Sequence, residues 1–228
     1  MLCDTLEQIY AEIADAAQRS GRTPDSVCLV AVSKRQEIDA IRRVISCGQQ
    51  VFGENYLQEA REKIAACQKE IRWHFIGHLQ GNKVRTAVEI FDVIETVDTI
   101  KTARLIDRYA GILARNPEIL LQVNIGKEKQ KHGVLPEKTE ALLSAIRQET
   151  QLRVSGLMAL PPWSGNPEDS RPYFIKLRQL AEQLSDKGLF TGAETVKLSM
   201  GMSADYTIAI EEGATLVRVG TALFGPRK

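Results

Sequence analysis

The chain lacks an excess of charge of either sign. Lysine and arginine together number 30, against 29 for aspartate and glutamate. Recognition of nucleic acid or of an anionic membrane through overall charge requires a basic excess, so we expect neither as a partner. Any phosphate group must therefore be bound by a local arrangement of residues.

Cysteine and histidine are also scarce. The three histidines have no metal-site spacing with cysteines or carboxylates, so His74 and His78 are expected to be structural and no metal is predicted. The basic run GKEKQKHG at 126–133 is interpreted as a solvated loop. Four cysteines lie in the first third of the chain without CxxC spacing, and we expect them to be reduced, as in cytosolic proteins: Cys3, Cys28, Cys47 and Cys67.

No hydrophobic run is long enough to span a membrane, which takes about 20 apolar residues. Residues 1–22 instead alternate acidic and apolar positions. This pattern predicts an amphipathic N-terminal helix rather than a signal peptide. We therefore expect a soluble, cytoplasmic protein.

Eight short apolar segments recur along the chain, separated by stretches with a helical pattern. Their nearly continuous hydrophobicity is typical of parallel strands buried on both faces. Eight such units close a barrel, so we predict an α/β fold, a single (β/α)8 TIM barrel domain over 1–228, with an open doubly wound sheet as the alternative. The expected strands are 27–34, 50–55, 72–78, 93–98, 118–124, 154–160, 195–200 and 215–220.

Helix boundary signals fit the gaps between these strands. Asp98 is expected to cap a helix that runs to Leu113, and Pro136 suits the first turn of the next helix. Gly48 and Gly188 stand where two further helices should end.

Lys34 ends the first predicted strand, and the ends of the strands are where α/β barrels carry their chemistry. A lysine that is partly buried beside other cations has a lowered pKa and can form an imine with an aldehyde. Taken alone, a solvated lysine at the start of a loop is the simpler explanation. The motifs near the other end of the chain favour the first interpretation.

Two turns near the carboxyl terminus favour a phosphate site at the same mouth. Ser199, Gly201 and Ser203 precede an expected amphipathic helix, so N–H groups and hydroxyls would face an anion there. Ser203 as a simple helix cap is the alternative. Gly220 and Thr221 follow the eighth strand and would complete the phosphate cup.

Arg218 is expected to point into the barrel. Period-two alternation places Leu216, Arg218 and Gly220 on one face of the last strand. An inward guanidinium requires an acidic side chain, a phosphate or a ring nitrogen as its partner. A purely structural ion pair is the alternative.

An imine-forming lysine beside a phosphate cup points to pyridoxal phosphate, an aldehyde that carries a phosphate. Asn55 is a weaker candidate, as a side chain that flanks the cofactor ring. Glu54 is expected to be a structural anion that pairs with Lys34 or Arg218. A barrel that binds a sugar phosphate without imine chemistry is the alternative, and the lysine at the strand end disfavours it.

These segments together resemble the pyridoxal-phosphate homeostasis proteins of the YggS/PROSC type, whose barrel is similar to the amino-terminal domain of alanine racemase. The resemblance covers nearly the whole chain, and its last segment is specific enough to identify the family alone. The matching stretches are LVAVSK, FGENYLQE, HFIGHLQGNK, VNIGKEKQKHG, GLMAL and SMGMSADYTIAIEEGATLVRVGTALFG.

The resemblance implies that Lys34 carries pyridoxal 5′-phosphate as an internal aldimine, which is a Schiff base, and that Arg218 faces the pyridine nitrogen. Because a guanidinium does not give up its proton, the nitrogen stays unprotonated and the ring becomes a weaker electron sink. The residues implied around the phosphate are Ser199, Met200, Ser203, Gly220 and Thr221.

Racemisation also requires a second acid or base on the opposite face of the substrate. In the racemase a tyrosine from a separate β domain of the partner subunit fills this role, and this chain, which ends at Lys228, leaves no room for such a domain. Tyr56 and Tyr206 are weaker candidates near the mouth.

We therefore expect a non-catalytic protein of pyridoxal phosphate homeostasis that influences amino-acid and keto-acid balance. Apoenzymes that depend on pyridoxal phosphate are the expected recipients. A small pyridoxal-phosphate-dependent amino-acid racemase is the alternative function. Without the racemase's dimerising domain, a monomer is expected.

Overall fold

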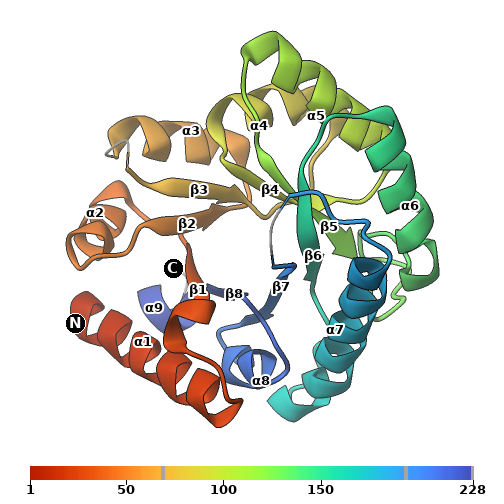
Figure 1. The fold of residues 1–228 in the computed structure, drawn as a ribbon. Helices are drawn as coiled ribbons and strands as arrows, with labels where there is room; N and C mark the ends of the chain where they lie inside the picture. The colour runs from red at the N-terminus through yellow and green to blue at the C-terminus, as the bar shows by residue number, and fades with distance from the viewer. Residues whose placement is uncertain (68–69, 193–194, 227–228) are drawn as a thin grey trace.

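The structure is a computed structural model that describes residues 1–67, 70–192 and 195–226. Lys228, where the expected domain range ends, lies outside the described residues. Eight parallel strands form a closed barrel in the order β1 to β8, and helices surround it (Figure 1). Closure is made by β8, in which residues 216–219 pair in parallel with residues 28–31 of β1. An open sheet would leave these two edges unpaired, so the prediction of a TIM barrel is confirmed.

Seven of the eight apolar segments predicted from the sequence contain one strand of the barrel each, and the seventh overlaps a strand that runs past its predicted end at residue 200, to Met202. The boundaries differ only at the ends, where the polar residues that close several segments lie in the following loops. The strands are β1 (Cys28–Val32), β2 (Val51–Glu54), β3 (Arg72–Phe75), β4 (Val93–Val97), β5 (Glu118–Val123), β6 (Val154–Ala159), β7 (Lys197–Met202) and β8 (Leu216–Val219).

Helices α2 to α8 lie between successive strands, α1 precedes β1, and α9 follows β8. Short 3-10 turns η1 (Pro24–Ser26), η2 (Gly81–Lys83) and η3 (Pro167–Ser170) accompany them. The α-helices are α1 (Leu2–Arg19), α2 (Ile38–Ser46), α3 (Leu57–Ala66), α4 (Val84–Ile90), α5 (Ile100–Leu113), α6 (Pro136–Glu149), α7 (Arg171–Asp186), α8 (Tyr206–Glu211) and α9 (Thr221–Phe224). The amphipathic N-terminal helix expected from the sequence is therefore present as α1.

The helix boundary signals are confirmed with one exception. Pro136 is the first residue of α6, and Gly48 and Gly188 adopt positive φ angles just after α2 and α7. The exception is Asp98, because α5 is capped by Thr99, whose hydroxyl accepts from the backbone N–H of Thr102 at 3.2 Å. Asp98 is thereby left for another contact, described below.

Side chains of the strands form two apolar layers. A small cluster fills the inside of the barrel, and a larger one lies between the strands and the helices. In β8, Leu216 belongs to the inner cluster, whereas Val217 and Val219 belong to the outer one. The alternation predicted for this strand is confirmed, and it directs Arg218 inward. The inner cluster consists of Val30, Leu120, Met158 and Leu216.

The expectation of four reduced cysteines is wrong for one pair. Cys3 of α1 and Cys47, which follows α2, form a disulfide with their Cα atoms 5.5 Å apart. Cys28 and Cys67 are free. The two bonded cysteines are 44 residues apart in the chain, so only the packing of α1 against α2 shows that they meet.

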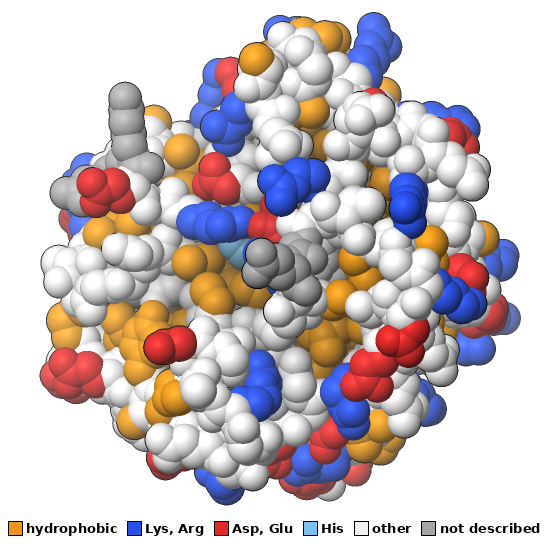
Figure 2. All heavy atoms as spheres, viewed as in Figure 1, with side chains coloured by type: hydrophobic (Ala, Val, Ile, Leu, Met, Phe, Trp, Pro, Cys, Tyr) orange, Lys and Arg blue, Asp and Glu red, His pale blue; other side chains and the backbone are white. Residues whose placement is uncertain are grey.

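A large cavity lies at the end of the barrel where the strands begin. Successive strands run clockwise in Figure 1, and right-handed βαβ units run clockwise when seen from that end. Figure 2, in the same view, shows a central hollow with apolar side chains around it. This cavity of about 840 Å³ is lined by Cys28, His74 and Leu216, among others, and by none of the expected site residues. Four lysine or arginine residues line it, and two of them, Arg72 and Lys197, pair with Glu118.

Among the described residues, no helix combines the length and the apolar character needed to cross a membrane.

Candidate functional site

Lys34 lies in the turn that follows β1, at the mouth formed by the carboxyl ends of the strands. Its side chain is half-buried and lines a small cavity together with Gly220 and Thr221, which follow β8. Because β1 and β8 are neighbours in the closed barrel, closure brings a lysine near the amino terminus against a turn near the carboxyl terminus. Three of the predicted site residues therefore share one cavity.

Ser203 ties the two expected phosphate turns to each other. Its hydroxyl accepts from the backbone N–H of Gly220 at 3.1 Å and of Ala222 at 3.2 Å. The alternative role of Ser203 as a cap of α8 is wrong, because Asp205 occupies the N-cap position and its carboxylate accepts from the N–H of Met202 at 2.7 Å. The hydroxyl of Ser203 thus lies where two N–H groups converge, a place where an oxygen of an anion would also fit.

Arg218 points into the barrel, as predicted, and is almost completely buried. Its guanidinium donates to the Ser199 hydroxyl at 2.5 Å and to the Ala159 carbonyl at 2.8 Å. Glu95, a fully buried residue of β4, lies 4.0 Å from the same guanidinium. The acidic partner that an inward arginine requires is therefore present in the protein itself.

A chain of polar side chains continues from Arg218 along the inside of the barrel. The Ser199 hydroxyl donates to one oxygen of Glu95 at 2.5 Å, and the other oxygen lies 2.6 Å from Nδ1 of His74. His74 in turn lines the cavity at the opposite end of the barrel. The buried His74 thus has the structural role expected of it. This series of hydrogen-bonded side chains connects the mouth with the far end of the barrel.

The charged groups in this series of side chains shift each other's pKa values. Burial opposes the charged form of Glu95, but the hydrogen bond and charge interaction with His74 and the charge of Arg218 outweigh it. Together they hold the pKa of this carboxyl below its usual value. Burial lowers the pKa of the Arg218 guanidinium, against the opposing charges of Glu95 and Asp205. A guanidinium nevertheless remains protonated in proteins, so Arg218 is a fixed cation.

Ser199 and Met200 lie deeper than the cavity around Lys34. Ser199 is fully buried, and its hydroxyl is engaged by Arg218 and Glu95. The Met200 side chain packs in the outer apolar layer, so only its backbone can face the mouth. The structure therefore separates the predicted phosphate residues into a group at the surface of the mouth and a pair beneath it.

Asn55 lies at the same mouth, after β2, the strand that pairs with β1. It lines a cavity of about 240 Å³ with residues that follow β3 and β5, among them His78 and His132. Its side-chain oxygen Oδ1 is buried and has no hydrogen-bond partner. A buried acceptor without a partner is costly, which makes Asn55 a residue that a ligand would satisfy.

Glu54 pairs with neither Lys34 nor Arg218, and this expectation is wrong. Its carboxylate accepts from Nζ of Lys63 and from the Ser33 hydroxyl, both at 2.7 Å. Burial raises the pKa of Glu54, and the Lys63 and Ser33 hydrogen bonds oppose that shift. Glu54 is a structural anion, as expected, but with a partner on α3.

The two tyrosines considered as acid or base groups lie differently. The Tyr206 hydroxyl donates to Glu12 of α1, and burial together with Glu12 raises its pKa. Tyr206 therefore connects α8 to the outer helix and does not face the mouth. Tyr56 precedes α3 and is half-exposed.

Sequence reasoning missed Glu95, Lys63 and the contact between His78 and His132. The sequence does carry a signal for Glu95, because it is the one acidic residue within the apolar strand VIETV. A lone acidic residue in a buried strand indicates a buried polar contact. Lys63 had none, since a lysine inside a polar helix is ordinarily exposed. His132 lies within a basic run, whose composition is typical of a solvated loop and gives no sign of a contact with His78.

Comparison with known proteins gives the family. Residues 5–228 match the family model described as the N-terminal domain of alanine racemase. The pyridoxal phosphate homeostasis protein of Aquifex aeolicus is 40% identical over 99% of this chain and 98% of its own length. That of Pseudomonas aeruginosa is 42% identical over 99% of this chain and 96% of its own length. The chain belongs to the pyridoxal phosphate homeostasis protein family.

A solved structure of this family shows the same fold. PipY of Synechococcus elongatus PCC7942, with pyridoxal phosphate bound, is 37% identical to this chain. It superimposes with a TM-score of 0.85 and covers 99% of this chain and 100% of its own. The resemblance recognised in the sequence motifs is therefore confirmed across the whole barrel.

Proposed function

We propose that this protein binds pyridoxal 5′-phosphate reversibly at the mouth of the barrel, as a Schiff base on Lys34, and serves its homeostasis without catalytic turnover. The observation that carries the proposal is the shared cavity of Lys34, Gly220 and Thr221. An amine that can react with an aldehyde thus lies directly beside a turn that can receive a phosphate.

The residues present fit this cofactor. Ser203, Gly220, Thr221 and the backbone of Met200 would hold the phosphate, with Ser199 beneath them. Asn55, whose buried Oδ1 has no hydrogen-bond partner, would face the ring side of the cofactor. When bound, pyridoxal phosphate supplies an aldehyde that condenses with amines and a ring that withdraws electrons.

Arg218 supports the absence of turnover. Ser199, Glu95 and the Ala159 carbonyl hold its guanidinium in place, so it would meet the ring nitrogen as a fixed cation. A protonated nitrogen beside it would bring two positive charges together, which keeps the nitrogen neutral and the ring a weak electron sink. Tyr206, one of the two tyrosines considered for the second acid or base, is engaged by Glu12 on the outside of the barrel.

The proposal also covers the location of the protein and the proteins that receive the cofactor from it. It works in the cytoplasm as a monomer, delivers the cofactor to apoenzymes that depend on it, and thereby affects amino-acid and keto-acid balance. A cytoplasmic disulfide is uncommon, so the Cys3–Cys47 bond makes thiol trapping in intact cells a direct check on this location.

The visible absorption spectrum of the purified protein, recorded before and after borohydride reduction, tests cofactor binding. We expect an imine band that reduction removes, and a cofactor-modified peptide that contains Lys34. The matched variants are Lys34→Ala and Lys176→Ala, because Lys176 is an exposed lysine on α7. Only the first should lose the band. A reduced adduct on another lysine, or no band after incubation with excess cofactor, would overturn the proposal.

Turnover is tested by exchange of the α-proton of amino acids with solvent deuterium at high protein concentration. Histidine is the most common acid or base group in enzymes, and His78 and His132 lie at the mouth, so turnover is measured directly. We expect no exchange above that of the Lys34→Ala variant. Exchange above this control would make the protein a small amino-acid racemase or a related enzyme.

A further inference from the structure

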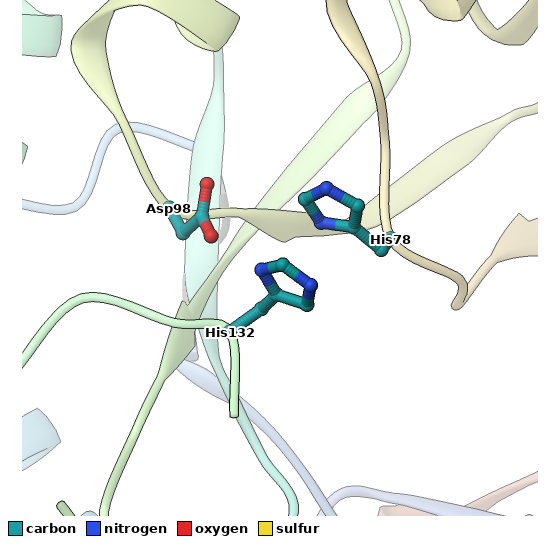
Figure 3. Close-up of side chains that lie close together, drawn as sticks. All are labelled: His78, Asp98 and His132. Carbon is teal, nitrogen blue, oxygen red and sulfur yellow. The ribbon is translucent and has the colours of Figure 1, made fainter. Parts of the chain in front are cut away.

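Three side chains of metal-ligating type meet at the mouth, on the side away from Lys34. His78 follows β3, Asp98 follows β4, and His132 lies in the loop after β5. Their ligand atoms all lie within 4.8 Å of one another. Figure 3 shows the carboxylate of Asp98 facing the two imidazole rings. Because β3, β4 and β5 are neighbouring strands of the sheet, their pairing brings the group together at the carboxyl ends of the strands.

The loop that carries His132 is held in place by its own hydrogen bonds. The Asn124 side chain donates to the carbonyls of Glu128 at 2.8 Å and of Lys131 at 3.2 Å, and accepts from the Glu128 N–H at 3.1 Å. A Cβ at Gly133 would lie 2.6 Å from the Asn124 backbone nitrogen, so the loop returns this closely only with glycine there. His132 is therefore positioned by a built turn rather than by a loose basic run.

Further hydrogen bonds orient the ligands from behind. Asp98 accepts from the backbone N–H of Gly133 at 3.3 Å, which leaves its other oxygen to face the histidines. The carbonyl of His132 accepts from the Gln122 side chain at 3.2 Å. The first bond holds the Asp98 carboxylate, as supporting bonds to ligand groups do in metal sites, and the second holds the backbone of His132.

The two imidazoles are stacked, with ring centroids 3.6 Å apart and planes inclined by 11°. Each ring offers two nitrogens, and a histidine coordinates a metal through a ring nitrogen that carries no proton. The nearest lysine does not compete for the site. The Lys131 ammonium is paired with Glu128 at 2.5 Å and donates to the Pro161 carbonyl at 3.0 Å.

We propose that His78, Asp98 and His132 form a binding site for a divalent transition metal, with Zn²⁺ as the best match. Two imidazoles and one carboxylate suit zinc, and three protein ligands leave a fourth position open to water or an anionic oxygen. Tetrahedral zinc at about 2.1 Å from each ligand needs ligand atoms about 3.4 Å apart. The nitrogen lone pairs of two stacked rings do not converge on one point, so the rings must turn out of their stack on binding. Both histidines are exposed, and the adjoining cavity of about 240 Å³ leaves room for this rotation.

Competition with a colorimetric zinc chelator tests the proposal on the full chain without pyridoxal phosphate, so the result is independent of the proposed function. We expect one Zn²⁺ per chain. His78→Gln, His132→Gln and Asp98→Asn should each weaken binding at least about tenfold, a loss that even outer partners of a metal commonly cause. The control is Asp186→Asn, which removes an exposed carboxylate at the end of α7 and should change nothing.

Two further measurements separate this site from adventitious binding. Co²⁺ in place of Zn²⁺ should give visible bands of nitrogen and oxygen ligation without a sulfur charge-transfer band, because Cys28 and Cys67 are not part of the site. Circular dichroism should show that all variants are folded. No binding at stoichiometric Zn²⁺, unchanged affinity in His132→Gln, or a sulfur band would each overturn the proposal.

Discussion

Glu95→Gln tests the buried, hydrogen-bonded side chains that hold Arg218 in place. The wild-type carboxylate is fully buried, accepts from Ser199 at 2.5 Å, contacts His74 at 2.6 Å and lies 4.0 Å from the guanidinium. Glutamine keeps the volume but removes the negative charge, so Arg218, which is 3% exposed, loses its ion-pair partner and keeps only the weaker charge interaction with Asp205. Removing one member of a buried ion pair costs about 3 kcal/mol or more.

The expected loss in the free energy of unfolding corresponds to a measurable decrease in Tm. For a chain of 228 residues, an unfolding entropy of about 2.1 cal/mol/K per residue makes about 3 kcal/mol equivalent to about 6 °C in Tm. Urea unfolding followed by circular dichroism measures the free energy directly. The matched control is Glu182→Gln on α7, whose partner Arg178 lies 3.1 Å away at an exposed site. This control should cost less than about 1 kcal/mol.

A double variant identifies the cause. Adding Arg218→Met to Glu95→Gln removes the unpaired cation, so the double variant should recover part of the stability that Glu95→Gln loses. The reasoning is refuted if Glu95→Gln costs no more than Glu182→Gln, or if the two buried changes add without any recovery.

The pH dependence of the same variant has a definite sign. The pKa of Glu95 in the folded protein lies below its ordinary value of 4.5, so folding favours the charged form. Its contribution is complete above pH 4.5 and is lost as the pH falls further, through the folded pKa. The stability difference between wild type and Glu95→Gln should therefore be constant near pH 7 and shrink below pH 4.5. A difference that grows on acidification would contradict this account.

Three further predictions concern other parts of the molecule. Lys34→Ala should fold with stability within about 0.5 kcal/mol of wild type, because the side chain is half-buried at the mouth; loss of the circular dichroism spectrum would show a structural role instead. Gly77→Ala should destabilise by more than about 2 kcal/mol in urea unfolding, since its Cβ would lie 2.2 Å from the Asn55 carbonyl oxygen, whereas Gly111→Ala on α5, with no atom within 4 Å, should not. Non-reducing peptide mapping should recover Cys3 and Cys47 in one cross-linked pair, and separate free thiols at both would rule the bond out.

Much of the barrel was predictable because its information is local. A strand buried on both faces must be apolar along its length, so eight such segments predicted the eight strands that the structure contains. Side-chain alternation in a strand has a period of two, which is why Arg218 could be directed inward from its neighbours alone. Motifs at strand ends likewise predicted that Lys34, Gly220 and Thr221 would converge.

The partners of these residues were less accessible to sequence reasoning. The expectation that Glu54 pairs with Lys34 or Arg218 is wrong because Lys63 of α3 pairs with it. Helix periodicity does not show which side of α3 faces β2, so the sequence alone does not predict this contact. The Asp98 cap failed because Thr99, one residue later, has the geometry to accept the helix N–H. In both cases several residues could make the contact, and only the packing of the folded chain determines which of them does.

By itself, the sequence determined the kind of elements, their order and the end of the barrel at which polar residues gather, because each follows from spacing along one segment. Tertiary structure decided which distant residues touch: Cys3 with Cys47, Glu95 with Arg218, and His78 with Asp98 and His132. These contacts depend on the closure of the sheet, its register and the packing of helices on it. No local periodicity carries that information, since each contact joins segments whose relative position exists only in the folded chain.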